Sequence, residues 1–260
     1  MEASRTMRVV ESRLLTYKRT WRFGVTTSFV NPFLFLLSMG VGLGSIVDKS
    51  TTSASTLHGV DYLTFLAPGL LAATAMQVAA GEATYPVLAS VKWNPVYRGM
   101  LATPLSVGDL VAGQVTWIGI RLLQATTVFL VVMGLFGAIE SPLALAAVPA
   151  ATLTGLAIAA PICAYSASVQ RDTGLSTVLR FGIIPMFLFS GTFFPISQLP
   201  TALQWIAYFT PLWHGVDLCR SLSLGTAELL PSIGHVVYLS TWFVVGTWLA
   251  AKAFAKRLIL

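Results

Sequence analysis

Hydrophobic positions in this chain come in long blocks, and short polar segments separate the blocks. Six stretches are mainly apolar: residues 24–47, 62–89, 107–136, 142–168, 179–194 and 233–253. A helix needs about 20 apolar residues to cross a hydrocarbon core roughly 30 Å thick. Backbone polar groups must find partners within the protein there, which favours helices over irregular segments. The pattern therefore predicts an all-α membrane protein with six transmembrane helices.

Composition leaves no room for a soluble enzyme domain. Hydrophobic residues make up 55% of the chain and charged residues 10%, and the mean hydropathy is +0.77. We expect two parts, an amphipathic helix over residues 1–22 and a single membrane domain over residues 23–260. The net charge of +6 would suggest nucleic acid as a partner for a soluble chain. In a membrane protein the same charge is typical of cytoplasmic segments, so we expect no nucleic-acid partner.

The first 22 residues show helical periodicity. Apolar and aromatic side chains recur every three or four positions: Met7, Val10, Leu14, Tyr17 and Trp21. Basic residues occupy most of the remaining surface, which is typical of a helix that lies in the headgroup layer of a membrane. A helix packed on a partner protein is the alternative.

The distribution of Lys and Arg predicts the orientation. Thirteen of them fall in the two termini and in the connections 90–105 and 169–180, whereas Lys49 and Arg220 alone fall in the other connections. Positive residues gather on the cytoplasmic side. Both termini are therefore expected in the cytoplasm, in agreement with an even number of spans.

The connection 91–105 predicts a short helix on the cytoplasmic side. Asn94 is a suitable N-cap, Pro95 suits the first helical position, and Pro104 ends the helix. One face then carries aromatic and apolar side chains: Trp93, Tyr97, Met100 and Leu101. The residues alone leave two interpretations open, an interfacial connector with aromatic anchors or a docking surface for a cytoplasmic partner.

Residues 195–224 contain two helical pieces that are too short to span and too apolar for a free loop. Pro211 separates them. We interpret them as a re-entrant hairpin that dips into the outer half of the bilayer, which is tolerated where protein or a cavity covers it. A packed external cap without a transport role is the alternative.

Two ionisable residues lie inside predicted spans, Glu82 in the second and Arg121 in the third. Charges within a membrane usually face the protein interior and pair with each other, so we expect a structural ion pair. A proton-relay or substrate-binding role for Glu82 is the alternative. His58, His214 and His235 do not cluster in the sequence at metal-ligand spacing, and we expect no metal site.

Motifs for chemistry are absent from the sequence. It contains no Gly-x4-Gly-Lys-Ser/Thr phosphate loop and no Gly-x-Ser-x-Gly nucleophile elbow. We therefore expect a protein that is not an enzyme and that carries no cofactor of its own. A membrane-embedded enzyme acting on lipids and an ion-coupled transporter remain the rivals to a transport subunit driven by a separate ATPase.

Two motifs resemble those of ABC-2 type ABC exporter permeases. The first runs from Leu188 to Pro195 (LFSGTFFP), continues with Gln198-Leu199-Pro200, and ends in TPLWHGVD from Thr210 and in Arg220; the second is Arg98 followed by Met100 to Ser106 (MLATPLS). Glu82, Tyr85 and Gly108-Asp109 resemble the branch that contains nodulation-factor (lipooligosaccharide) exporter permeases and daunorubicin-type drug exporters. The resemblance covers essentially the whole chain.

The resemblance implies a permease subunit in the bacterial plasma membrane that exports a lipid-linked glycan, a lipid or a hydrophobic drug. It implies two cytoplasmic ABC ATPase subunits, which carry ATP and Mg, and a second permease copy as partners, besides membrane lipids. It assigns the ATPase-coupling role to Trp93, Asn94, Pro95, Tyr97 and Arg98. It assigns the external hairpin and gate to Gly191, Phe194, Pro195, Leu199, Pro200, Pro211, His214, Asp217 and Arg220. Relatives often carry a Glu- and Arg-rich stretch where this chain has Trp93-Asn94-Pro95.

Overall fold

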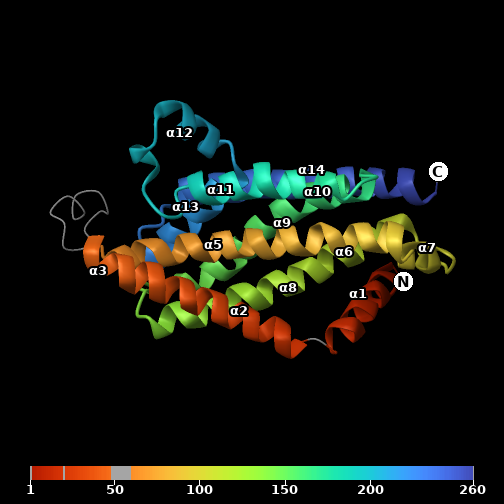
Figure 1. The fold of residues 1–260 in the computed structure, drawn as a ribbon, viewed down its shortest axis with the longest axis horizontal. Helices are drawn as coiled ribbons and strands as arrows, with labels where there is room; N and C mark the ends of the chain where they lie inside the picture. The colour runs from red at the N-terminus through yellow and green to blue at the C-terminus, as the bar shows by residue number, and fades with distance from the viewer. Residues whose placement is uncertain (1, 20, 48–59, 260) are drawn as a thin grey trace.

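The computed structural model describes residues 2–19, 21–47 and 60–259, and every regular element in these ranges is a helix (Figure 1). The N-terminal half contains α1 (Glu2–Tyr17), α2 (Trp21–Phe35), the π-helix η1 (Leu36–Leu43), α3 (Gly44–Val47), α5 (Tyr62–Ala83), α6 (Tyr85–Leu88), the π-helix η2 (Ala89–Trp93), α7 (Val96–Leu101) and α8 (Val107–Leu135). The C-terminal half contains α9 (Ala144–Ser168), α10 (Thr173–Val178), the π-helix η3 (Leu179–Ile183), α11 (Ile184–Phe189), the 3₁₀-helix η4 (Ile196–Gln198), α12 (Thr201–Tyr208), α13 (Pro211–Leu224) and α14 (Leu229–Leu258).

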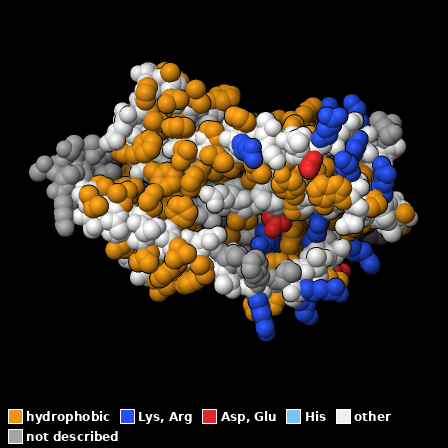
Figure 2. Space-filling view, viewed as in Figure 1, with side chains coloured by type: hydrophobic (Ala, Val, Ile, Leu, Met, Phe, Trp, Pro, Cys, Tyr) orange, Lys and Arg blue, Asp and Glu red, His pale blue; other side chains and the backbone are white. Residues whose placement is uncertain are grey.

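The long helices run along the long axis of the molecule, and its two ends differ (Figure 1). One end holds α7 and both chain termini, and the other holds α3, α12 and α13. Most Lys and Arg side chains on the visible face gather toward the end with α7, whereas hydrophobic side chains dominate the opposite end (Figure 2).

Within the described residues, five helices are long and apolar enough to cross a membrane: Ser28–Val47, Tyr62–Trp93, Val107–Leu135, Ala144–Ser168 and Leu229–Leu258. They correspond to five of the six stretches expected from the sequence. The remaining stretch, 179–194, corresponds to the shorter apolar helix Thr173–Phe189. This helix starts earlier than expected and stops before Gly191, whose φ of +77° is incompatible with its continuation. The count of six spans stays a prediction.

Burial shows which helices form the centre of the bundle. In the most apolar 18-residue part of the span Tyr62–Trp93, 78% of the residues are buried. The corresponding share is 22% for Ser28–Val47 and 17% for Leu229–Leu258. Helix α9 contacts α5, α8, α13 and α14. Gly155 of α9 lets α5 and α8 approach closely, because a Cβ there would lie 2.6 Å from Leu122 and 3.1 Å from the Ala75 carbonyl oxygen. The helices α5 and α9 therefore form the core, and α2 and α14 lie at its edge.

The N-terminal helix α1 is shorter than the helix expected over residues 1–22. It ends at Tyr17, and Trp21 opens α2. Val9 and Val10 are buried, and Val9 fits against Gly113 of α8, where a Cβ would lie 2.6 Å from the Val9 Cβ. Helix α1 therefore packs one face on α8.

The start of α8 follows the sequence prediction. The Ser106 side chain accepts from the Asp109 backbone N–H, and the Asp109 carboxylate accepts from the Ser106 backbone N–H. These two bonds form a capping box, which fixes where the chain enters α8 after α7.

Candidate functional site

Glu82 of α5 and Arg121 of α8 form an ion pair inside the bundle. Arg121 Nε lies 3.0 Å from Glu82 Oε1, and the Arg121 and Glu82 side chains are 14% and 23% exposed. Trp117 Nε1 donates to Glu82 Oε2 at 3.3 Å, and Arg121 Nη1 donates to Gln124 Oε1 at 2.9 Å. Each charge thus has an opposite charge and a further polar neighbour. The structural role of the pair stays a prediction.

Helix α1 reaches this ion pair through Tyr17. The Tyr17 hydroxyl donates to Gln124 Oε1 at 3.0 Å, and the Arg121 guanidinium lies 4.3 Å from the centre of the Tyr17 ring. The ring also meets Trp117 edge-on at 5.6 Å. A guanidinium over an aromatic face is attracted by the ring quadrupole, so Tyr17 ties the end of α1 to the charged centre of the spans.

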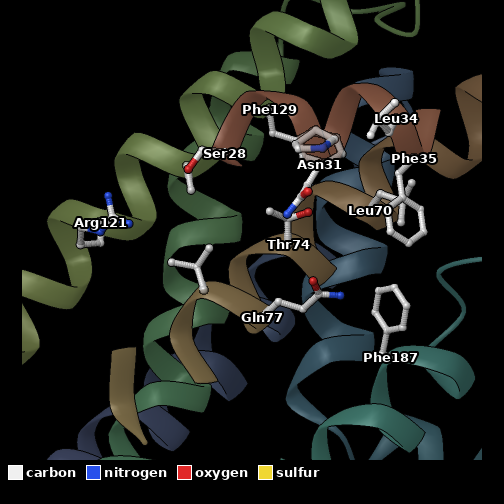
Figure 3. Close-up of a pocket in the computed structure, with 13 residues that line it drawn as sticks. Ser28, Asn31, Leu34, Phe35, Leu70, Thr74, Gln77, Arg121, Phe129 and Phe187 are labelled. Atoms are coloured by element: carbon white, nitrogen blue, oxygen red, sulfur yellow. The ribbon is translucent and has the colours of Figure 1, made fainter. Parts of the chain in front are cut away.

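A cavity of about 540 Å³ opens beside the ion pair, between α2, α5, α8 and α11 (Figure 3). Arg121 lies at one end of it. Polar side chains follow along its wall: Ser28, Asn31, Thr74 and Gln77. The other end is apolar and is lined by Leu34, Phe35, Leu70 and Phe187. The cavity thus changes from charged and polar to apolar along its length. The sequence prediction singled out only Arg121 among the polar residues of this wall.

The segment predicted to couple to an ATPase is exposed at the end that carries the termini. Trp93 is 52% exposed, and Asn94, Pro95 and Arg98 are also exposed. The helix start differs from the prediction, because Pro95 and not Asn94 precedes the first residue of α7 and no side chain caps it. Asn94 is instead extended and ends η2.

Tyr97 does not contribute to that exposed surface. Its side chain is fully buried, and its ring lies 5.6 Å from Phe254 of α14. Arg13 Nη2 donates to the Tyr97 hydroxyl at 2.8 Å and to Ser90 Oγ at 3.0 Å, and Tyr97 donates to Gln114 Oε1 at 3.0 Å. Burial raises the pKa of Tyr97 above its ordinary value, so the hydroxyl stays protonated. Tyr97 therefore presents no surface to a docked protein in this structure and instead anchors α7 to α1, α8 and α14. Its coupling role stays a prediction.

The external hairpin consists of α12 and α13, and a proline lies at the start of each of its helical pieces. Pro195 precedes η4, Pro200 precedes α12, and Pro211 is the first residue of α13. Phe194 and Leu199 are half-buried in the connecting loop. Helix α13 packs on α5 and α9, and its buried Gly215 faces Thr154. The hairpin is therefore anchored by α13. Its role as a gate stays a prediction.

Arg220 of α13 connects its own helix to α5 and to the loop that follows α11. Its Nε donates to the Phe65 carbonyl oxygen at 3.1 Å and its Nη2 to the Gly191 carbonyl oxygen at 2.8 Å. The guanidinium also lies 3.8 Å from the centre of the Phe65 ring. Gly69 leaves room for it, since a Cβ there would lie 3.0 Å from Arg220 Nη2. Gly191 and Arg220 both belong to the first motif of the sequence analysis, and the hydrogen bond to the Gly191 carbonyl oxygen joins them in the structure.

We expect Arg220→Ala to loosen the loop that follows α11. A hydrogen bond to a charged group contributes about 1.5–3 kcal/mol, and the substitution leaves the carbonyl oxygens of Phe65 and Gly191 without this donor. Amide hydrogen exchange over residues 190–196 should become at least tenfold faster. Arg180→Ala, at an exposed arginine of η3, is the control and should leave this exchange unchanged. Unchanged protection in Arg220→Ala would contradict the anchoring role.

Two histidines that are far apart in the sequence are in contact in the structure. His214 Nδ1 lies 2.8 Å from His235 Nδ1 of α14, and His235 Nε2 lies 3.1 Å from Asp217 Oδ2. Burial, followed by the nearby His235, lowers the pKa of His214 to about 4, so His214 is neutral near pH 7. His58 lies outside the described residues. No group of three or more His, Cys, Asp or Glu side chains suited to a metal ion occurs in the described ranges.

Residues 5–224 match the family model of the ABC-2 type transporter. The chain belongs to the ABC-2 type transporter family. Among its relatives, Nodulation protein J of Rhizobium leguminosarum bv. viciae is 32% identical over 244 residues, which cover 92% of this chain and 90% of that protein. Nodulation protein J of Rhizobium meliloti (strain 1021) is 30% identical over 246 residues, covering 94% and 90%.

Membership of the ABC-2 family indicates where the protein is located and what it assembles with. The chain is a multi-pass protein of the inner membrane, and it associates with ATPase subunits in an ABC transporter. The ABC-2 model spans the segment before α7, the ion pair, the cavity and the external hairpin. These features therefore belong to one transport subunit.

Proposed function

We propose that this ABC-2 permease exports an amphiphile, a lipid-linked glycan, a lipid or a hydrophobic drug, outward across the plasma membrane, driven by ATP. The observation that carries the proposal is the family match over residues 5–224. The relatives named Nodulation protein J agree with the resemblance to nodulation-factor exporter permeases. The cavity between the spans, polar at one end and apolar at the other, suits a cargo of the same character.

The proposed assembly contains two copies of this permease and two ATPase subunits, and the ATPase subunits hold ATP and Mg. The proposed topology has six spans, with the helix Thr173–Phe189 as the fifth, and cytoplasmic termini. Figure 1 shows this helix running along the long axis beside α14, which supports counting it as a further crossing. The clustering of Lys and Arg supports the orientation. In this topology α1 lies at the cytoplasmic interface and the α12–α13 hairpin enters the outer half of the bilayer.

In the proposed cycle the exposed segment around Trp93 and Arg98 rests on the ATPase. ATP brings the ATPase subunits together and moves this segment, and α7 transmits the movement to α1, α8 and α14 through the buried Tyr97. The cargo leaves past the external hairpin. ATP and cargo can drive the change only because they bind the two conformations with different affinity.

Co-purification with the ABC ATPase partner of this permease tests the docking role. We expect the double variant Trp93→Ala/Arg98→Glu to lose most of the bound ATPase, at least tenfold, because both side chains are exposed. Trp205→Ala is the matched control, since Trp205 is 72% exposed on α12 at the opposite end, and it should retain the ATPase. Full retention by the double variant would refute the docking surface. Export at the full rate by the permease alone would refute the proposed function.

A further inference from the structure

A groove of about 420 Å³ lies between the start of α8 and the second half of α14. The residues that line it include Gly108, Val111 and Ala112 from α8 and Val244, Trp248 and Ala251 from α14. Every lining residue that the structure describes is uncharged. Ala112, Val244 and Trp248 are exposed, so the groove opens away from the core of the bundle.

Two lysines extend the groove toward the end of α14. Val244, Trp248, Lys252 and Lys256 recur every four positions and therefore form one ridge on the helix, and all four are exposed. Lys252 Nζ lies 3.6 Å from the centre of the Trp248 ring. The groove is thus apolar along its length and positively charged at one mouth.

The dimensions of the groove match one leaflet of a bilayer. At a rise of about 1.5 Å per residue, Phe243 in the groove lies about 13 Å from Lys252 along α14. Half of a hydrocarbon core is about 15 Å thick. Lys252 falls at the end of the apolar stretch 233–253, where the headgroups begin. The groove therefore runs through the acyl chains of a single leaflet.

The polar groups at the charged mouth are hydrogen-bond donors. An ammonium group offers three donors and no acceptor, and the indole of Trp248 offers one N–H that has no partner in the described part of the chain. The acid next to Gly108 in the sequence, Asp109, is 9% exposed and already bonds to Ser106. A ligand at this mouth must therefore bring acceptors and negative charge, as the phosphate and ester carbonyls of a phospholipid do.

A second copy of the permease fits this groove less well. Two copies in one membrane are related by an axis along the membrane normal, so each groove would face its equivalent at the same depth. Lys252 and Lys256 would then face like charges. An anionic lipid instead compensates both lysines.

We propose that the groove between α8 and α14 binds an anionic phospholipid. Lys252 and Lys256 bind the phosphate, the Trp248 indole lies beside it, and one acyl chain lies in the groove. In the proposed topology this lipid belongs to the cytoplasmic leaflet. The inference goes beyond the proposed function, because the groove is separate from the cavity between α2, α5, α8 and α11 and concerns neither cargo nor ATPase.

Photolabelling in nanodiscs of phosphatidylcholine tests the proposal. The permease with its ATPase receives a trace of phosphatidylglycerol or of phosphatidylcholine, each with the same diazirine in one acyl chain. A lysine beside an anionic lipid raises affinity about fivefold, so we expect phosphatidylglycerol to label the groove at least tenfold more strongly. Val236 and Val237, exposed near the start of α14, should be labelled equally by both probes. Equal labelling of the groove overturns the proposal.

Variants of the lysines test the headgroup contact. Lys252→Gln/Lys256→Gln should reduce labelling of the groove by phosphatidylglycerol about tenfold and leave labelling by phosphatidylcholine unchanged. Lys18→Gln/Arg19→Gln is the matched control, because it removes the same charge at exposed positions between α1 and α2, on the opposite side of the bundle from α14 in Figure 1. The control should label as the wild type does. Unchanged labelling in the lysine variant overturns the proposal.

Two further variants test the chain contact and the rival occupant. Ala112→Phe places a ring in the groove and should lower labelling by phosphatidylglycerol at least fivefold although both lysines remain. Unchanged labelling counts against the groove as the site. Cys163 and Cys219 are buried, so a disulfide between two copies of Val244→Cys would report contact at that position. Such a disulfide, with no preference for phosphatidylglycerol, would show that a second copy covers the groove, and the proposal fails.

Discussion

Glu82→Gln is expected to lower the free energy of unfolding by about 3 kcal/mol, the lower end of the range for removing one partner of a buried ion pair. The substitution leaves Arg121, whose side chain is 14% exposed, without an opposite charge in a largely buried position. Gln124 and the Tyr17 ring remain beside the guanidinium but carry no charge to compensate it. The loss should appear in thermal or denaturant unfolding of the purified permease in detergent.

A double-mutant cycle separates the pair from its neighbours. Arg121→Gln should be destabilising as well, and Glu82→Gln/Arg121→Gln should be less destabilising than the sum of the two single variants, because the double variant leaves no unpaired charge. Glu140→Gln, at an exposed position in a loop, is the control for loss of a carboxylate and should change stability little. Additive effects of Glu82→Gln and Arg121→Gln would show that the two residues do not stabilise each other.

The sequence was sufficient to predict the helices and their approximate ends. The hydrogen bonds of a helix join residues close together in the sequence, and the length of an apolar stretch can be compared directly with the thickness of a membrane. Both properties can therefore be recognised within a single segment of the sequence. Two helix ends differ from the predicted ones. The left-handed backbone at Gly191 stops α11 before Phe194, and α1 stops at Tyr17.

Contacts between distant segments were harder to predict. Periodicity placed Tyr97 on an apolar face but did not show that Arg13 from α1 covers it, 84 positions away in the sequence. His214 and His235 come from different helices, and a search for spacing within one helix cannot find them. Glu82 and Arg121 were the exception, because two opposite charges at similar depth in adjacent spans leave few other partners.

The polar wall of the cavity gave almost no signal in the sequence. Asn31, Thr74 and Gln77 are uncharged, and a single amide or hydroxyl in a span is common because neighbouring helices or backbone carbonyls usually satisfy it. Their significance depends on two observations that only coordinates supply: they share one cavity, and they lack partners among the described residues.

Gly246→Ala is expected to weaken the attachment of α14 to α9. A Cβ at Gly246 would lie 2.6 Å from Pro161 Cδ and 2.8 Å from Pro161 N, and these ring and backbone atoms cannot turn away as a flexible side chain would. Helix α14 packs mainly on α9 and less on α13 and α8, so a displacement at Gly246 acts on its main attachment. Overpacking of this kind costs about 1–3 kcal/mol. Unfolding of the purified permease should therefore shift to lower temperature.

Gly234→Ala in the same helix provides the matched control. A Cβ there meets nothing within 4 Å, so the substitution adds no clash and instead stabilises the helix by about 0.5–1 kcal/mol because alanine loses less backbone entropy than glycine. The two variants are chemically identical and differ in surroundings alone, so opposite shifts in unfolding temperature would trace the effect to the contact with Pro161. Equal shifts would mean that α14 does not depend on this close approach, and that its position against α9 is set by the contacts of Leu239, Ala250 and Phe254, which are also buried on α14.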